Sequence, residues 1–208
     1  MNNQSSLFID VNEQKKVFKD SNLEVLYYPN FFNLDLSEKL FSRLFQSIEW
    51  VNDSFKFGGK ELQVSRRTAF YGDDNTSYTY SGFKKHSIPW TKDLLYIKKK
   101  IYENGFQEFN SVLLNDYSSG KVGMGWHSDN EKELGLNPTI ASVSFGASRD
   151  FFLRRKDRKN KDLLKIYIEN GSLLIMKGKT QHYWSHSIPK RLKIKNRRIN
   201  LTFRNIIQ

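Results

Sequence analysis

The amino-acid sequence predicts a mostly β fold with flanking helices, and three observations support this class. Short apolar runs, separated by turn-forming or charged segments, follow one another from residue 109 to the end, a pattern typical of a sandwich or barrel. Two stretches with a 3.6-residue apolar period precede them. The chain has 208 residues, of which 38% are hydrophobic and 27% charged, so a single domain can bury a hydrophobic core.

The first helix is expected over residues 36–49. Asp35 would be its N-cap, and Glu38 three positions later completes a capping-box pattern. A second helix follows Pro89, with Thr91 as its cap. Along each segment the apolar residues fall on one face, namely Leu36, Leu40, Phe41, Leu44, Phe45 and Ile48 in the first and Leu94, Ile97 and Ile101 in the second.

Residues 52–82 contain glycine pairs and many aromatic residues, which predicts short strands and tight turns. An earlier strand is expected at 23–28, before Pro29. Later strands are expected at 109–117, 139–145, 150–155, 163–168, 173–176 and 199–205. We expect residues 1–22 to form a polar tail and residues 23–208 to form a single domain.

Lysine and arginine outnumber aspartate and glutamate by 34 to 22, which gives a formal net charge of +12. This excess indicates a polyanionic partner such as nucleic acid, although a basic surface that only aids solubility carries the same charge. Cysteine is absent, which excludes disulfides, thiolate metal sites and cysteine nucleophiles. Without a long apolar run or a signal-peptide core, we expect an intracellular protein that makes no membrane contact, nuclear if eukaryotic and otherwise cytoplasmic.

A candidate metal site begins at His127 and Asp129. Side chains two positions apart in an extended segment point to the same side, so this pair can present an imidazole nitrogen and a carboxylate oxygen to one ion. Spacing allows either His182 or His186 as a third ligand. Two histidines and one carboxylate form the ligand set of non-haem iron(II) oxygenases. A hydrogen-bonded His–Asp pair in a surface turn is the alternative.

The C-terminal strand alternates polar and apolar residues from Arg198 to Arg204. Arg198, Asn200, Thr202 and Arg204 therefore share one face of it. Two arginines inside a core are costly unless an anion is present, and a dicarboxylate such as 2-oxoglutarate could satisfy both. An amphipathic edge strand with solvated arginines is the alternative.

These segments match a known family. The family pattern comprises His127-Ser128-Asp129, His186-Ser187, Arg198–Arg204, Tyr71-Gly72-Asp73, Tyr78–Gly82, Ile140–Ala147 and Gly171–Leu174, in a region from about Phe55 to Ile206. The sequence resembles the AlkB family of Fe(II)/2-oxoglutarate dioxygenases, and most closely its branch that repairs alkylated double-stranded DNA in animal nuclei. The resemblance implies a double-stranded β-helix (jelly-roll) core at about 105–208 and an N-terminal nucleotide-recognition lid at about 52–90.

The resemblance also assigns roles to the polar residues around the candidate metal site. It implies His127, Asp129 and His186 as iron ligands and places His182 outside the ligand set. Arg204 would hold the end of 2-oxoglutarate that chelates iron. The distal carboxylate and its surroundings would be held by Arg198, Asn115, Tyr117 and Asn200.

A pocket for the flipped base is implied as well. Tyr80 would stack on the base opposite the ring of His127, with Tyr78 and Ser81 lining the pocket. Glu131 stands where the family places a carboxylate that meets the exocyclic amine of the base. The two tyrosines also fit ordinary strand aromatics.

Two positions depart from the family pattern. Asn130 stands where the animal double-strand enzymes carry a second acidic residue. The finger residue that fills the gap left by the flipped base would be Phe57, although its register to Gly58-Gly59 is one position off.

The implied reaction is oxidative demethylation of 1-methyladenine and 3-methylcytosine in DNA, with release of formaldehyde, succinate and CO2. The implied cofactors are Fe(II), 2-oxoglutarate as cosubstrate and O2. Alkylated DNA, single- or double-stranded, is the expected partner of a monomeric protein. An RNA demethylase of the same family and a non-catalytic basic nucleic-acid-binding module are the alternatives.

Overall fold

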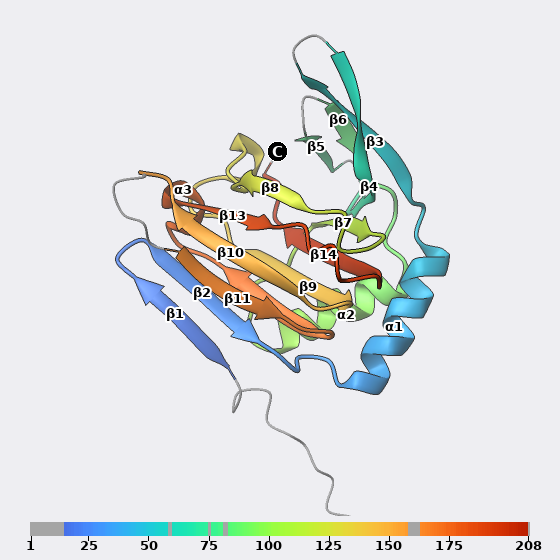
Figure 1. Ribbon diagram of the computed structural model, residues 1–208, viewed down its shortest axis with the longest axis horizontal. Helices are drawn as coiled ribbons and strands as arrows, with labels where there is room; N and C mark the ends of the chain where they lie inside the picture. Colours follow the sequence, from blue (N-terminus) through green and yellow to red (C-terminus); the bar gives the residue numbers. More distant parts are fainter. Residues whose placement is uncertain (1–14, 58–59, 75, 81–82, 158–162, 208) are drawn as a thin grey trace, which may run out of the picture.

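The computed structural model describes residues 15–57, 60–74, 76–80, 83–157 and 163–207, and for 53–57, 60–64, 78–80 and 83–85 it describes the backbone alone. The described part is mostly β, with two antiparallel sheets and two long helices at one side (Figure 1). The predicted mostly β class with flanking helices is therefore confirmed. No helix in these ranges is long and apolar enough to span a membrane.

The larger sheet contains eight strands in the order β1-β2-β12-β9-β14-β7-β4-β3. Strand β14 lies in its middle and pairs antiparallel with β9 on one side and β7 on the other. The strands are β1 (Lys16–Asp20), β2 (Leu23–Tyr28), β3 (Val51–Phe57), β4 (Lys60–Gly72), β7 (Ser111–Tyr117), β9 (Ile140–Gly146), β12 (Ser172–Met176) and β14 (Arg198–Arg204).

The smaller sheet faces the larger one across an apolar layer. Its order is β11-β10-β13-β8, made of β8 (Met124–His127), β10 (Arg149–Arg155), β11 (Leu163–Ile168) and β13 (Trp184–Ile188). Leu113 and Leu174 of the larger sheet share a buried cluster with Leu153 and Ile166 of the smaller one. The remaining elements are the hairpin β5 (Ser77–Tyr80) with β6 (Phe83–His86), the short helix α3 (Thr180–Tyr183) and the 3-10 turn η1 (Lys132–Leu134).

Helices α1 (Leu34–Ser47) and α2 (Lys92–Glu103) cover the other face of the larger sheet (Figure 1). Leu44 of α1 and Ile97 of α2 belong to the same buried cluster as Val112 and Leu201 of the sheet. The apolar stripes that predicted these helices therefore pack on the larger sheet.

The start of α1 differs from the expectation. Asn33, not Asp35, is the N-cap, and its side chain accepts a hydrogen bond from the Leu36 amide at 2.9 Å. Asp35 lies in the first turn, where a carboxylate is favoured by the helix dipole. The cap of α2 is Thr91, as predicted, with its hydroxyl oxygen 3.3 Å from the Leu94 amide nitrogen.

The expected strands of the second half are present within two residues of their predicted bounds. Four of the described strands were not predicted, namely β1, β6, β8 and β13. Strand β1 falls inside the segment expected to be a tail and pairs along its length with β2. The part of that segment from residue 1 to 14 lies outside the described residues.

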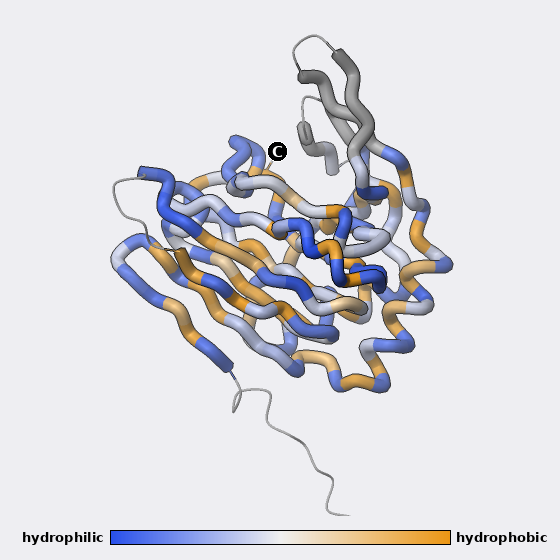
Figure 2. The backbone as a smooth tube through the Cα atoms, in the orientation of Figure 1, coloured by the Kyte–Doolittle hydropathy of each residue, from blue (hydrophilic) through white to orange (hydrophobic). Residues whose placement is uncertain are grey.

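Strand β14 separates two environments, because its side chains alternate between the two faces of the larger sheet. Ile199, Leu201 and Phe203 enter the core shared with the helices. Arg198 and Arg204 point the other way, into a pocket between the two sheets, although all seven residues of the strand are buried. Hydrophilic and hydrophobic residues accordingly mix along the strands of the sandwich (Figure 2).

Candidate active site

Three candidate metal ligands meet at one end of the sandwich. His127 ends β8 and pairs across the ladder with His186 of β13, and Asp129 follows two residues after the first histidine. One ligand atom from each residue lies within 4.8 Å of the other two, and this is the one such group in the described part of the chain. His182, which spacing alone also allowed, lies on α3, where its Nε2 is 3.4 Å from the Asn137 amide nitrogen.

Neighbouring groups orient two of these ligands. The Nδ1 atom of His127 is 2.9 Å from the Gly125 carbonyl oxygen, so Nδ1–H donates there and Nε2 is left with its lone pair for a metal. The Arg204 guanidinium donates to Oδ2 of Asp129 at 2.9 Å, and both side chains are almost fully buried.

The ionisation of the site favours a cation. Burial alone would raise the pKa of the Asp129 carboxyl, but the charges of Arg204, His186 and His127 outweigh it and hold this pKa well below its usual range. Burial, assisted by the nearby His127, lowers the pKa of His186 to about 3. At neutral pH the site therefore offers a carboxylate and a neutral buried imidazole, the forms that bind a metal.

A pocket with both polar and apolar walls opens beside the three ligands, between the two sheets. Its lining combines the ligands with the inner faces of β7, β9 and β14 and with apolar residues: Leu113, Asn115, Tyr117, Met124, His127, Asp129, Ser142, Phe151, Met176, His186, Ile188, Arg198, Asn200, Thr202 and Arg204. The structure thus brings together every metal and cosubstrate residue predicted from the sequence.

Arg198 lies in this pocket as a buried cation. Its Nη2 donates to the Ser144 hydroxyl at 2.9 Å, and its guanidinium carbon is 5.2 Å from the centre of the Tyr117 ring. Burial lowers the pKa of Arg198 to about 10, so the side chain remains positively charged at neutral pH. Its Nε and Nη1 atoms are buried and have no hydrogen-bond partner among the described residues, as expected of a site that receives an anion.

Two amide side chains complete the pocket wall. The Arg66 Nε donates to Oδ1 of Asn115 at 2.6 Å, which leaves the Asn115 Nδ2 as a donor. The Asn200 Nδ2 donates to the Ser142 hydroxyl at 2.8 Å and to the Val143 carbonyl at 2.9 Å. Asn200 therefore ties β14 to β9 within the wall.

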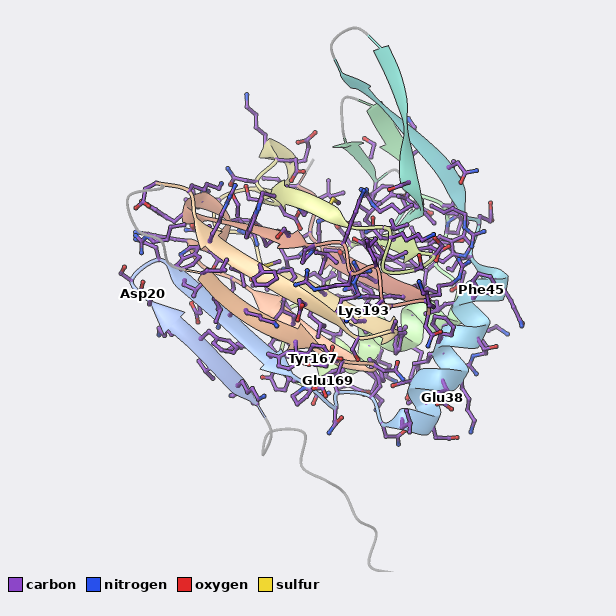
Figure 3. The ribbon with its side chains drawn as sticks, in the orientation of Figure 1. Asp20, Glu38, Phe45, Tyr167, Glu169 and Lys193 are labelled. Atoms are coloured by element: carbon purple, nitrogen blue, oxygen red, sulfur yellow. The ribbon has the colours of Figure 1, made fainter. Side chains whose placement is uncertain are left out.

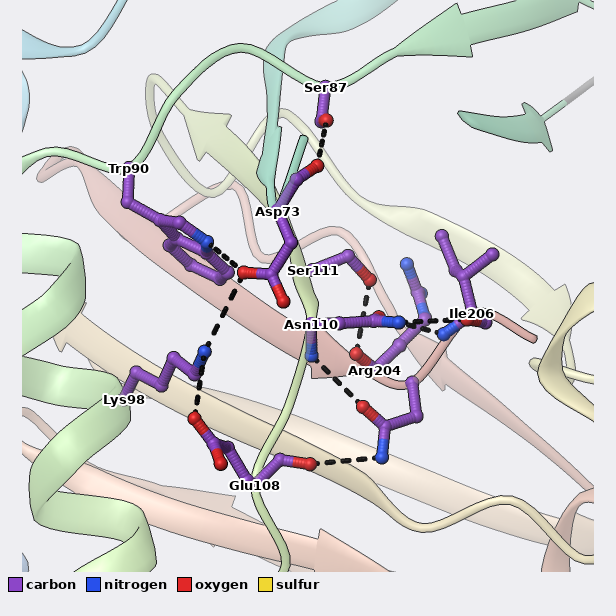
Figure 4. Close-up of polar contacts among 10 residues, drawn as sticks. Asp73, Ser87, Trp90, Lys98, Glu108, Asn110, Ser111, Arg204 and Ile206 are labelled. Carbon is purple, nitrogen blue, oxygen red and sulfur yellow. Dashed lines mark hydrogen bonds and ion pairs between the residues drawn. The ribbon is translucent and has the colours of Figure 1, made fainter. Parts of the chain in front are cut away.

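The segment after β14 is fastened to the start of β7 (Figure 4). Asn110 makes two reciprocal hydrogen bonds with Ile206, in which its Nδ2 donates to the carbonyl and its Oδ1 accepts from the amide, both at 2.8 Å. The Ser111 hydroxyl donates to the Arg204 carbonyl at 3.1 Å. These contacts fix the end of the strand from which Arg204 reaches Asp129.

Of the predicted base-pocket residues, only Glu131 has a side chain within the described part of the structure. Glu131 caps η1 and does not line the pocket, and its Oε2 is buried without a hydrogen-bond partner among the described residues. The side chains of Phe57, Tyr78 and Tyr80, and all of Ser81, lie outside the described residues.

Sequence reasoning missed Arg66, Ser142 and Ser144. The two serines carried a usable signal, because they alternate with apolar residues along the predicted strand 139–145 and so share its inner face. Arg66 gave no comparable signal, since its partner Asn115 lies 49 residues away in sequence.

The residues present fit a metal ion with an anionic cosubstrate beside it. Two histidines and a carboxylate on one side leave positions open for further ligands, as in non-haem iron(II) oxygenases. The buried Arg198, with two nitrogen atoms that make no hydrogen bond within the described residues, fits a carboxylate of an anionic cosubstrate.

The sequence matches the 2OG-Fe(II) oxygenase superfamily over residues 24–204. The chain belongs to this superfamily. Mouse "DNA oxidative demethylase ALKBH2" is 37% identical to it over 189 residues, which cover 86% of this chain and 79% of that protein. Rat "Alpha-ketoglutarate-dependent dioxygenase alkB homolog 3" is 39% identical over 193 residues, covering 88% of this chain and 64% of that protein.

These relatives place the oxygenase in the AlkB family, as the sequence resemblance predicted. The solved structure of OsALKBH1 superimposes with a TM-score of 0.61 over 92% of this chain and 99% of that one, at 16% identity, which supports the fold. With its His127–Asp129–His186 triad, this AlkB-family protein is an Fe(II)- and 2-oxoglutarate-dependent dioxygenase.

Proposed function

We propose that this enzyme reverses alkylation damage in DNA by oxidative demethylation of 1-methyladenine and 3-methylcytosine. The observation that carries the proposal is the metal triad placed directly beside an arginine-lined pocket. The name of the mouse relative, a DNA oxidative demethylase, supports the same reaction. Formaldehyde, succinate and CO2 would be the products besides the restored base.

The pocket residues divide the work of holding metal and cosubstrate. His127, Asp129 and His186 would hold the iron, which when bound supplies the oxygen chemistry that hydroxylates the N-methyl group. Arg204 holds the Asp129 carboxylate and would also meet the end of 2-oxoglutarate nearest the metal. Arg198 would form a charge-assisted fork with the distal carboxylate.

Asn115 and Tyr117 would help Arg198 with that carboxylate. The Asn115 Nδ2 donor and the Tyr117 hydroxyl come from the same face of β7, which is paired with β14. The Asn200 amide, already bonded to β9, would keep the pocket wall in place.

We describe the two sheets as a double-stranded β-helix, and strands β3 to β6 as the nucleotide-recognition lid. The lid would supply Tyr78, Tyr80 and Ser81 to the flipped base and Phe57 as the finger residue. Glu131 would meet the exocyclic amine, and its buried oxygen without a hydrogen-bond partner among the described residues is consistent with that role. An acidic, aromatic pocket suits bases that carry a positive charge.

The positive net charge would serve the approach to the substrate. With 34 Lys and Arg against 22 Asp and Glu, the chain attracts the phosphate backbone without reading sequence. Extrusion of a base from its stack costs a few kcal/mol and is easiest for a damaged, poorly paired base.

Turnover on three matched substrates tests the proposal. Enzyme with Fe(II), ascorbate, O2 and 2-oxoglutarate would be given single-stranded DNA, duplex DNA and RNA, each with one 1-methyladenine, and mass spectrometry would score the loss of one CH2. We expect repair of DNA that requires 2-oxoglutarate. Faster repair of RNA would replace DNA by RNA as the substrate class, and no repair of any of the three would refute the reaction.

A pair of histidine variants controls this experiment. His127→Ala should abolish repair because it removes an iron ligand, whereas His182→Ala, a change at a histidine outside the metal group, should retain it. Repair that survives in His127→Ala would contradict the iron mechanism.

A further inference from the structure

A buried acid lies on the back of the strand that carries Asn115 and Tyr117. The Asp116 side chain is only 1% exposed and points to the helix side of the larger sheet. Arg67 of β4 approaches its Oδ2 through Nη2 at 2.7 Å and through Nε at 2.8 Å. Arg197, which directly precedes β14, donates from Nη1 to the same oxygen.

Aromatic rings from the end of α1 cover the two arginines. The Arg197 guanidinium carbon is 4.6 Å from the centre of the Phe45 ring, and that of Arg67 is 5.6 Å from the same ring. Arg67 also lies 5.5 Å from the ring centre of Trp50. Phe45 is labelled on α1 in Figure 3. We call Arg67, Asp116 and Arg197 the back-face clamp.

The clamp mirrors the cosubstrate pocket residue by residue. Strands β4 and β7 each contribute two consecutive residues to the arrangement, and the third pair is Arg197, just before β14, with Arg198, its first residue; side chains of consecutive residues in extended chain point to opposite faces of a sheet. The pairs are Arg66 with Arg67, Asn115 with Asp116, and Arg197 with Arg198. One member of each pair belongs to the pocket side and the other to the clamp.

Strand register places the clamp and the pocket residues at the same level of the larger sheet. Arg67 and Ile199 are the partners of Asp116 on either side of β7. Arg198 is likewise the partner of Tyr117. The clamp therefore ties together β4, β7 and β14 at the level where the distal carboxylate would be bound.

Electrostatics gives Asp116 a specific task. Two guanidinium groups share one carboxylate oxygen, while Oδ1 of the same carboxylate is buried and makes no hydrogen bond to any described residue. Without the negative charge, the two like charges, on β4 and just before β14, would repel each other around a buried and neutral side chain, although both arginines are partly exposed to solvent. The strands on both sides of Asn115 and Tyr117 would then shift.

We propose that Asp116 is a positioning residue for 2-oxoglutarate, which acts through the back-face clamp to set the spacing of Asn115, Tyr117 and Arg198. Asp116 itself is not among the described residues that line the pocket. This inference rests on the proposed assignment of those three residues to the distal carboxylate.

Direct binding of the cosubstrate tests the proposal. Titration calorimetry would measure the Kd of 2-oxoglutarate for the full-length protein, loaded with Mn(II) in place of iron, as wild type and as Asp116→Asn. We expect the Kd to rise by about tenfold or more. In turnover, the KM for 2-oxoglutarate should rise in parallel, while kcat at saturating 2-oxoglutarate and the KM for the methylated oligonucleotide stay within about twofold of wild type.

Asp93→Asn is the matched control. It breaks the ion pair between Asp93 of α2 and Arg43 of α1, at 2.8 Å, in the same helix layer but away from the clamp. It removes a carboxylate from the helix layer without a change to the clamp, so the proposal requires a change in Kd in Asp116→Asn only. Equal Kd values for wild type and Asp116→Asn, or equal losses in the two variants, would overturn it.

Two further variants keep the outcome decidable. If Asp116→Asn does not fold, Arg197→Gln, which removes a partly exposed arginine of the clamp and leaves the buried carboxylate in place, should still raise the Kd, and an unchanged Kd would overturn the proposal. Arg198→Met tests the underlying assignment separately. If that variant binds 2-oxoglutarate normally, the proposed pocket roles fail, whereas a clear loss there with a normal Asp116→Asn refutes the clamp alone.

Discussion

Arg198→Met should stabilise the cosubstrate-free protein while it impairs binding of 2-oxoglutarate. The Arg198 side chain is 2% exposed, and its Nε and Nη1 make no hydrogen bond to a described residue. A buried donor without a partner costs about 1–3 kcal/mol, and methionine has a similar length without polar atoms. The lost Nη2 bond to the Ser144 hydroxyl offsets about 1 kcal/mol of the gain.

The two donors without a described partner together cost about 2–6 kcal/mol, so the expected net gain is about 1–5 kcal/mol, which for a chain of this size raises Tm by about 2–4 °C per kcal/mol. Binding should change in the opposite direction. A fork to a carboxylate contains two charge-assisted hydrogen bonds of about 1.5–3 kcal/mol each, so the Kd should rise by roughly 10² to 10⁴.

Differential scanning calorimetry and titration calorimetry measure the two effects. Arg149→Met is the matched control, because Arg149 is equally buried but donates to the carbonyls of Val122 and Pro189 at 2.9 and 2.7 Å. That substitution should lower Tm. A lower Tm in Arg198→Met as well, with an unchanged Kd, would refute the view that the buried donors of Arg198 lack partners because they bind an anion.

Three further predictions concern stability. Burial lowers the pKa of His186 from 6.5 to about 3 in the folded protein. Below pH 6.5 this imidazole therefore becomes protonated in the unfolded chain but stays neutral in the folded chain, which favours unfolding. The free energy of unfolding of the metal-free protein should fall by about 1.4 kcal/mol per pH unit between pH 6 and about pH 4. Urea unfolding at a series of pH values should show a weaker dependence of this free energy on pH in His186→Gln. Gly171 has φ +74°, and an added Cβ would lie 2.4 Å from the Phe32 carbonyl oxygen. Gly171→Ala should therefore lower Tm by several degrees or prevent folding. A wild-type Tm would contradict this steric argument. Asn110→Ala breaks both bonds to Ile206 and should cost about 1–3 kcal/mol in urea unfolding, with faster amide exchange at Ile206; unchanged exchange would show that the segment is held otherwise.

Local patterns were enough to predict the strand that builds the pocket. The alternation from Arg198 to Arg204 fixed both its conformation and its two faces, because a period of two leaves one choice of side for each residue. The same holds for the apolar stripes of α1 and α2, which were long enough to display a helical period.

Features that depend on distant partners were not predictable in this way. Spacing within the sequence left His182 and His186 open, and only the family resemblance chose His186; the pairing of β13 with β8 brings His186 to His127 and confirms that choice. Strands β1, β6, β8 and β13 are four or five residues long, too short for a clear period. Asp116 reads as one charge among many, because its two arginines are 49 and 81 residues away.

The helix cap shows a different limit. Asn33 and Asp35 are both good caps, and sequence alone favoured the second because Glu38 follows it. The buried Phe31 and Phe32 hold the chain in the core just before Asn33, so the helix begins as soon as that anchor ends. Tertiary packing therefore places the N-cap of α1 two residues before the position that the sequence pattern favoured.

The position of β8 at the rim of the smaller sheet has a consequence for how the protein loads its metal. This strand is joined to β13 through the partners His127 with His186 and Met124 with Ile188, with an irregularity between them. An ion bound between the two histidines would link β8 to β13 at this edge of the sheet. It would also close a chain segment of 59 residues into a loop. Metal occupancy should therefore be read out in the backbone of β8 itself, as slower amide exchange at Gly125 and Trp126, before any substrate is present.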